Sequence, residues 1–185
     1  MDSPLGTVIR IIDYFLYFAV AAIFITYVVM IYNNLVRLKH NVDKAWSNIE
    51  VLLKQRHDEI PKLVEVCKQF MSYEQETMNQ IIQTRSDVYA ALEKADIHRL
   101  GPAETQFRIR LGALLALSEA YPELKANSNF QHLEKRISIM ETSIADRRTF
   151  YNESVNRYNI RIQQVPDIIL ANLLRFRQQE LLEFK

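Results

Sequence analysis

This chain carries an unbroken apolar run from Tyr14 to Tyr32, nineteen residues without a charge, a glycine or a proline. As an α-helix rising about 1.5 Å per residue, the run would span roughly 28 Å, close to the ~30 Å hydrocarbon thickness of a bilayer. A helix satisfies its own backbone amides, which lipid cannot do. Tyr14, Tyr17 and Tyr32 would place amphipathic rings at the two headgroup levels. The run therefore predicts a transmembrane helix.

A buried core helix and a cleaved signal peptide are the alternatives to a membrane helix for this run. Uncharged sequence continues to Val36, which is long for the core helix of a soluble protein. Ala19-Val20-Ala21 matches a signal-peptidase site, but cleavage there would leave a chain that begins inside apolar residues 22–31. The sequence therefore favours a membrane anchor over both.

The charges beside the run predict its orientation. Arg10 is the only Lys or Arg before it, whereas Arg37, Lys39 and Lys44 follow within twelve residues of its end. Basic residues concentrate on the cytoplasmic side of a membrane helix, so we expect the N-terminus outside and the large domain in the cytoplasm. The predicted organisation is a short extracytoplasmic N-terminus (1–13), a transmembrane helix (14–32), a helical bundle (33–166) and an amphipathic C-terminal tail (167–185).

The charge balance argues against nucleic acid as a partner. Of 23 basic and 22 acidic side chains, Arg10, Asp2 and Asp13 precede the run, which leaves 22 and 20 for the rest of the chain. A net charge of +2 is no electrostatic footprint for a polyanion. The single cysteine, Cys67, excludes an internal disulfide and is expected to be a small core hydrophobe.

Long helices are predicted throughout the chain. Only three glycines and five prolines occur in 185 residues, and apolar residues recur every three or four positions, the spacing of helices that bury one face. Such helices with short connections predict an all-α fold, in which the transmembrane helix continues into an antiparallel bundle of long helices. The apolar stripes are Leu38, Val42, Ala45, Ile49, Leu52, Ile60, Leu63, Cys67, Phe70, Met78, Ile81, Val88 and Leu92, then Phe107, Leu111, Leu114, Leu115 and Tyr121, then Phe130, Leu133, Ile137, Met140, Ile144, Tyr151, Val155, Tyr158 and Ile162.

Local signals predict where these helices begin and end. Pro61 should kink or break the first long helix, because its ring removes one donor and crowds the preceding turn. Leu100-Gly101-Pro102 is expected to form the turn before the second stripe, and Tyr121-Pro122 to end that helix. Ser128, with Gln131 three residues later, predicts a capping box at the start of the third stripe.

The tail from Asp167 to Lys185 leaves two structures open. It is rich in Ile, Leu and Phe and is interrupted by Arg175 and Arg177. This pattern predicts either a last helix of the bundle or an amphipathic element that lies on the membrane or on a partner.

Four charged residues, Arg56, Glu74, Arg85 and Arg147, occupy positions where the stripes call for apolar side chains. Buried charges must be paired, so we predict interhelical salt bridges that fix the register of the helices. A proton-transfer role for Glu74 or Asp146 is the alternative, although no second carboxylate has a spacing specific for it.

Neither a metal site nor a catalytic constellation is recognisable. His57 and His132 lack the Glu three residues ahead that metal sites in helical bundles use, and His40 and His98 have no His or Cys at helical spacing. The sequence has no glycine-rich phosphate loop and no nucleophile motif. We therefore expect no catalytic residue, no metal and no cofactor, and a protein that is not an enzyme.

A family resemblance is carried by the apolar run and by four further stretches: YNNLVRLKHNVDKAWSNIEVLLKQRHDEIPKLVEVCKQFMSYE from Tyr32, RSDVYAA from Arg85, LSEAYPELKANSNFQHLEKRI from Leu117 and IADRRTFYNESVNRYN from Ile144. In this order they resemble the LemA family of bacterial membrane-anchored proteins. The resemblance implies one helix through the cytoplasmic membrane with a helical bundle facing inward, and it implies no catalytic residues. The ending LRFRQQELLEFK departs from the more Gly- and Pro-containing ending of the family.

Two motifs within these stretches mix aromatic rings with groups that need hydrogen-bond partners. They predict either a polar network that joins adjacent helices or a partner-binding face. The candidate residues are Trp46, Asn48, Arg56 and Asp58 in the first motif, and Asp146, Arg147, Arg148, Tyr151, Asn152, Asn156, Arg157 and Tyr158 in the second.

The leading hypothesis is a non-catalytic, membrane-anchored interaction or scaffold module of the bacterial cytoplasmic membrane. Its expected partners are the lipid membrane and either further copies of itself or another membrane protein. Two alternatives are a membrane-shaping protein, in which the tail inserts its Leu and Phe face into the leaflet, and a regulatory subunit of a membrane protease or other enzyme. The family resemblance bears on the first alternative, because some relatives in magnetotactic bacteria are linked to building internal membrane compartments.

Overall fold

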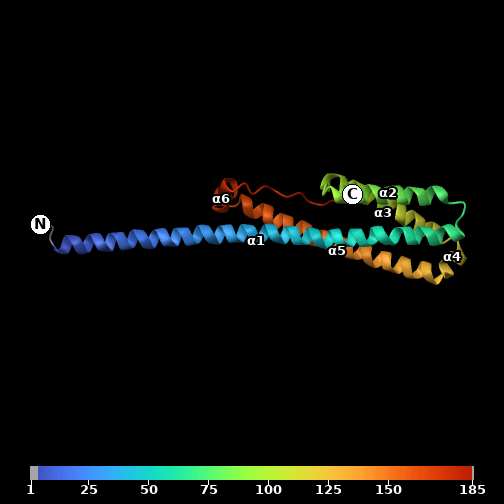
Figure 1. The fold of residues 1–185 in the computed structure, drawn as a ribbon, viewed down its shortest axis with the longest axis horizontal. Helices are drawn as coiled ribbons and strands as arrows, with labels where there is room; N and C mark the ends of the chain where they lie inside the picture. The colour runs from blue at the N-terminus through green and yellow to red at the C-terminus, as the bar shows by residue number, and fades with distance from the viewer. Residues whose placement is uncertain (1–3, 185) are drawn as a thin grey trace. The chain divides into compact units, whose positions relative to one another are not determined.

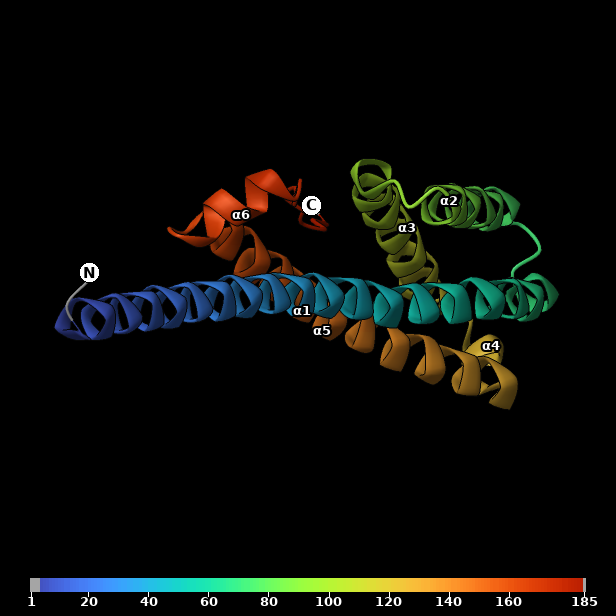
Figure 2. The ribbon, with the colours of Figure 1, turned by 60° about the vertical axis from the view of Figure 1, so that its left-hand side comes forward.

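A computed structural model describes residues 4–184, all of whose regular elements are helices. Figures 1 and 2 show them. This confirms the predicted all-α class with a long N-terminal helix. The helices are α1 (Pro4–Phe70), α2 (Gln75–Glu93), α3 (Ile97–Ser118), α4 (Pro122–Ala126), α5 (Ser128–Gln163) and α6 (Asp167–Leu173).

The chain divides into two compact units. The first unit comprises Met1–Asn41 and Arg157–Gln178, and the second comprises Val42–Asn156 and Gln179–Lys185. Helices α1 and α5 each contribute one end to each unit.

The second unit is an antiparallel bundle built from parts of α1 and α5 together with α2, α3 and the short α4. Helices α2 and α3 pack on each other as a hairpin, and Arg85 of α2 bonds to His57 of α1. Three contacts join α1 to α5: Trp46 with Tyr151, Arg56 with Glu141, and Glu59 with Arg136. The residue number rises along α1 where it falls along α5, so these two helices run in opposite directions.

The predicted apolar stripes form the core of this bundle. Ala45, Ile49, Ile60 and Leu63 of α1 are buried, and so are matching positions of the other three long helices. Cys67 is buried as predicted, and its burial raises the pKa of the thiol to about 11. Burial of one face per helix is the main source of stability in such a bundle.

The first unit contains the apolar run, the end of α5 and α6. One helix among the described residues is long and apolar enough to cross a membrane, and it is α1. The side chains of the run are exposed, for example Phe18 and Ile23, whereas Ile31 and Leu35 at its end and just beyond are buried. This pattern is consistent with a single membrane anchor.

Pro61 does not break α1, which continues through it to Phe70. Its neighbours Ile60, Leu63 and Val64 are all buried in the bundle. Packing of this apolar face outweighs the one backbone hydrogen bond that the proline removes. The predicted break is therefore wrong.

The turn expected at Leu100-Gly101-Pro102 lies earlier in the chain. These three residues belong to α3, and the chain turns instead around Ala95, whose φ is 49°. Asp96 is the N-cap of α3, because its carboxylate accepts a hydrogen bond from the backbone N–H of Arg99. Pro102 is the sixth residue of α3, and Leu100 and Gly101 beside it are buried, so packing outweighs the backbone hydrogen bond that the proline removes.

The start of α5 is capped by Asn127, and the predicted capping box of Ser128 and Gln131 is wrong. The Oδ1 atom of Asn127 accepts hydrogen bonds from the backbone N–H groups of Asn129 and Phe130. The Gln131 side chain instead donates to the carbonyl of Lys125. The cap lies one residue before the expected position, with a side chain equally suited to the role.

The tail is not one long helix. Helix α6 ends at Leu173, and no helix follows in the described residues up to Phe184. Leu182 is buried and Phe184 is partly covered, so these side chains do not form the free apolar face that an amphipathic helix would present. The single last helix left open by the sequence is therefore replaced by a short helix and an extended segment. The other structure, an amphipathic element on the membrane or on a partner, stays a prediction.

Candidate functional site

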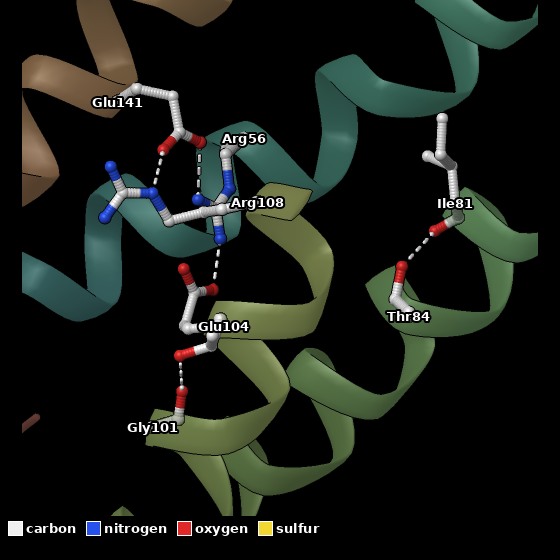
Figure 3. A network of polar contacts seen from close by, with 8 residues as sticks. Arg56, Ile81, Thr84, Gly101, Glu104, Arg108 and Glu141 are labelled. Carbon is white, nitrogen blue, oxygen red and sulfur yellow. Dashed lines mark hydrogen bonds and ion pairs between the residues drawn. The ribbon is translucent and has the colours of Figure 1, made fainter. Parts of the chain in front are cut away.

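Arg56 lies at the centre of a buried charged cluster, shown in Figure 3. Its guanidinium bonds to the Glu104 carboxylate of α3 and, at 2.6 Å, to Glu141 Oε1 of α5. It also lies over the Phe107 ring, 4.4 Å from the centroid. Arg108 Nε approaches the other oxygen of Glu141 at 3.4 Å. One side chain of α1 thereby joins α3 and α5, and the predicted interhelical salt bridge is confirmed at Arg56.

Burial and charge act in opposite directions on this cluster. Burial by itself lowers the pKa of Arg56, but Glu104 and Glu141 outweigh it, so the net pKa is raised. For Glu104, burial raises the pKa of the carboxyl and Arg56 opposes this change. Arg56 and Glu104 are 2% and 0% exposed. The arrangement is that of a buried structural ion pair of the kind that fixes helix register.

Glu104 was missed by reasoning from the sequence, although a signal for it existed. Leu100, Glu104, Phe107, Leu111 and Leu114 are spaced by four and three residues and all are buried. If the second stripe had been extended towards the N-terminus, across the supposed turn, Glu104 would have been recognised as a charged residue on the buried face.

A second polar contact joins α1 to α2. Arg85 Nε donates to the His57 carbonyl at 2.8 Å, and its Nη2 lies 2.7 Å from His57 Nε2. The imidazole stacks on the Tyr89 ring with centroids 4.2 Å apart. Burial and the Arg85 charge lower the pKa of His57 below its usual range. Neutral His57 therefore accepts from Arg85 through Nε2.

The extended C-terminal segment, residues 179–184, is bound against α5 through its backbone. Tyr151 Oη donates to the Glu180 carbonyl at 3.0 Å. Asn152 makes a two-way pair with Leu182, since its Nδ2 donates to the carbonyl at 3.0 Å and its Oδ1 accepts from the N–H at 2.9 Å. These contacts satisfy backbone groups that a strand neighbour would otherwise satisfy.

Side-chain contacts also hold this C-terminal segment in place. Leu182 is fully buried, and Arg148 lies over the Phe184 ring, 4.5 Å from the centroid. The Trp46 ring of α1 packs against the Tyr151 ring, with ring centroids 5.7 Å apart. Burial, followed by the charge of Glu180, raises the pKa of Tyr151 to about 12, so its hydroxyl stays a donor at neutral pH.

Residues 179–184 also contact helix α3, which forms the second wall of the site beside α5. His98 Nε2 lies 2.9 Å from a Glu180 carboxylate oxygen. Gly101 lies so close to the segment that a Cβ at this position would collide with the carbonyl oxygen of Glu183. Ile97 and Thr105 line the same hollow. We call this place, between α3 and α5 in the second unit, the tail groove.

The predicted candidate residues divide between this groove, the ion-pair cluster and the surface. Trp46, Arg148, Tyr151 and Asn152 build the groove, and Arg56 builds the cluster. Tyr158, in the first unit, donates to the Arg177 carbonyl at 3.0 Å. Arg147, predicted on the buried stripe, is exposed, which corrects that assignment. The other exposed candidates are Asn48, Asp58, Asp146, Asn156 and Arg157.

Within the described residues, no group of three or more His, Cys, Asp and Glu side chains is arranged to hold a metal ion. Glu74, the alternative proton-transfer residue, accepts a hydrogen bond from Tyr121 Oη at 3.3 Å.

Over residues 4–184, the fold and the site define an all-α protein with one helix apolar enough to cross a membrane, continuing into an antiparallel bundle that binds an extended segment of its own chain. The chain belongs to the LemA family, whose match covers residues 45–185.

Named relatives support this membership. The chain is 26% identical over 185 residues to magnetosome protein MamQ 2 of Paramagnetospirillum magneticum, covering 88% of this chain and 68% of the relative. It is 29% identical over 153 residues to protein LemA of Metamycoplasma hominis, covering 80% and 68%. It is 25% identical over 181 residues to magnetosome protein MamQ of Magnetospirillum gryphiswaldense, covering 85% and 66%.

Proposed function

We propose that this chain is a non-catalytic, membrane-anchored interaction module that assembles with further copies of itself by exchanging C-terminal segments. The observation that carries this proposal is the tail groove, where Tyr151 and Asn152 hold residues 179–184 as an extended peptide. The apolar run of α1 is the proposed anchor in the bacterial cytoplasmic membrane, with the bundle on the cytoplasmic side.

The groove suits exchange because it binds the segment mainly by backbone groups and one buried leucine. The same contacts form whether the segment comes from its own chain or from a neighbour, which is the condition for domain swapping. Anchoring in a membrane raises the effective concentration of copies, so exchange needs little additional affinity.

The buried charges support the non-catalytic part of the proposal. Arg56, Glu104 and Glu141 are engaged with one another inside the bundle. Such pairing serves register rather than proton transfer to a substrate. A purified full-length protein that turns over a substrate, and loses that activity on Glu74→Gln, would contradict this part.

A photocrosslinking experiment tests the exchange. A photoreactive phenylalanine analogue replaces Phe184, whose ring lies under Arg148, and the full-length chain is irradiated in membranes together with a second, differently tagged copy. Exchange predicts adducts between the two tags that map to α5 near Arg148. Adducts confined to single chains would overturn the exchange.

Matched variants identify the groove as the origin of the adduct. Gly101→Ala should abolish the inter-chain adduct, because the new Cβ collides with the bound segment. Gly112→Ala, on the same helix with nothing within 4 Å of its Cβ position, should leave the adduct intact. The same probe at exposed Phe150 controls for random collisions.

The orientation has a separate test. Reporter domains fused after residue 185 distinguish a cytoplasmic from an external bundle. The charge pattern predicts activity only from a cytoplasmic reporter, and an active external reporter would reverse the proposed topology without affecting the groove.

A further inference from the structure

The first unit exposes an apolar edge where α5 turns into α6. Val165, Ile169 and Leu173 are 83%, 69% and 75% exposed. They are spaced by four residues, so Ile169 and Leu173 share one side of α6 and Val165 precedes them on the connecting turn. Single exposed apolar side chains are ordinary in proteins. A contiguous set of large ones marks a contact surface.

This edge is held in place by buried contacts. Arg161 forms an ion pair with Asp167, which is 1% exposed. Ala171 is buried, and its carbonyl accepts a hydrogen bond from the Phe176 N–H at 2.9 Å. Tyr158 Oη fixes the returning chain at Arg177. The edge is therefore presented by a braced corner of residues 160–177, which we call the α5–α6 corner.

The corner lies beside the end of the apolar run, within the same unit. Arg161 lines one hollow together with Tyr27, Met30, Asn34 and Arg37 of α1. Figures 1 and 2 both show α6 alongside the light-blue section of α1. In a membrane-anchored chain, this section is where the helix leaves the hydrocarbon for the headgroups.

The charges around the edge suit a phospholipid surface. Residues 160–178 contain three arginines and one acidic residue, Asp167. Asp167 is engaged with Arg161, while Arg175 and Arg177 are exposed. Arginine side chains can extend along an apolar surface and place their charge at lipid phosphates.

We propose that the α5–α6 corner is a second membrane contact, which inserts Val165, Ile169 and Leu173 into the headgroup region of the leaflet that α1 enters. The inference rests on the proposed anchor but not on exchange of C-terminal segments. It gives the protein two contacts with one leaflet, so the first unit is oriented on the bilayer rather than tethered by a single helix.

Fluorescence quenching in vesicles tests the contact. Full-length Ile169→Cys is labelled with a polarity-sensitive fluorophore and reconstituted into phosphatidylcholine–phosphatidylglycerol vesicles, with or without bromine on the acyl chains. Cys67 is buried and its thiol pKa is raised to about 11, so the introduced cysteine is the one that reacts. We expect blue-shifted emission and a loss of fluorescence with brominated lipid. Leu173→Cys should behave alike and serves if the first variant fails to fold.

Two further positions separate the possible outcomes. Ile25→Cys lies in the apolar run and reports on the anchor, whereas exposed Ile139→Cys lies in the second unit and should stay unquenched. Quenching at position 25 but not at 169 and 173 would overturn the second contact and leave the anchor standing. No quenching at position 25 would overturn the anchor itself. A blue-shifted but unquenched probe at position 169 would assign the edge to a protein neighbour and also overturn the proposal.

Discussion

At the scale of single residues, Arg56 shows how one buried charge organises a bundle. It lies on the apolar stripe of α1, yet it satisfies carboxylates from both α3 and α5. Removing one partner of a buried pair leaves the other charge without compensation, which costs more than the pair itself contributes.

Arg56→Met should therefore destabilise the protein by about 3–5 kcal/mol, because Glu104 remains buried without its partner. The double variant Arg56→Met with Glu104→Leu should recover most of this loss, since both charges are replaced by apolar side chains. Thermal and denaturant unfolding of the full chain in detergent, followed by circular dichroism, measures both variants. A double variant no more stable than the single one would show that the pair is not the dominant interaction at this position.

His57 should make stability depend on pH. Burial and Arg85 hold the pKa of folded His57 below the ordinary 6.5, so the unfolded chain binds this proton more tightly than the folded one. The free energy of unfolding should then fall as the pH drops below about 6.5 and continue to fall until the folded pKa is passed.

The test compares melting temperatures at neutral and mildly acidic pH for the wild type and for His57→Phe, which keeps a ring against Tyr89. The variant should show a smaller decrease on acidification. Exposed His132→Gln is the control and should follow the wild type. An unchanged decrease in His57→Phe would assign the pH dependence to other groups.

At the scale of helices, the start of α5 depends on one side chain. Asn127 Oδ1 accepts two backbone N–H groups of the first turn, whereas Ser128 is already the first helical residue. Asn127→Ala should destabilise the protein by about 1 kcal/mol, within the usual range of roughly 0.5–2 kcal/mol for a lost N-cap. Ser128→Ala should have little effect in the same unfolding experiment. A larger loss of stability in Ser128→Ala than in Asn127→Ala would support the capping box that the sequence predicted.

The helices themselves were largely predictable, and several of their ends were not. The stripes identified most buried positions, because burial of one face follows directly from apolar spacing. Pro61 and Leu100-Gly101-Pro102 misled because local breakers are weak compared with the packing of flanking residues such as Ile60 and Leu100, both fully buried. Trp46 and Tyr151, one from each of the two motifs, are in contact across neighbouring antiparallel helices. The extended course of residues 179–184 could not be foreseen, since the segment is held through its own backbone groups by the Tyr151 and Asn152 side chains, and backbone groups leave no pattern in the sequence.

Gly101 and Gly112 differ in a way that tests the tail groove within one helix. Gly101→Ala should release the C-terminal segment, because the new methyl group collides with the Glu183 carbonyl. Trypsin should then cleave after Arg177 faster than in the wild type. Gly112→Ala should keep the wild-type rate and gain up to about 1 kcal/mol of stability from the better helix former. Equal cleavage rates in both variants would show that the segment is not closely seated against α3.

At the scale of the whole molecule, the chain divides into two units with different features. The apolar run and the α5–α6 corner belong to the first unit, and the tail groove belongs to the second. The sequence predicted the membrane helix and the bundle from composition and period alone. It did not predict that the C-terminal residues return to the second unit after passing through the first, because that course depends on pairings between distant residues such as Asn152 and Leu182.

Truncation after Gln178 separates folding from assembly. The shortened chain keeps every helix, but it loses the segment that fills the tail groove and buries Leu182. We therefore expect unchanged helicity, a lower melting temperature and loss of self-association in membranes. A peptide of residues 179–185 should raise the melting temperature of the truncated chain. At a peptide concentration one hundred times its Kd, the free energy of unfolding should rise by about 2.7 kcal/mol. A peptide with Leu182→Asp should fail to do so, because the charge would enter a buried site. Self-association that survives truncation would mean that copies meet through another surface, and that the groove only closes the chain on itself.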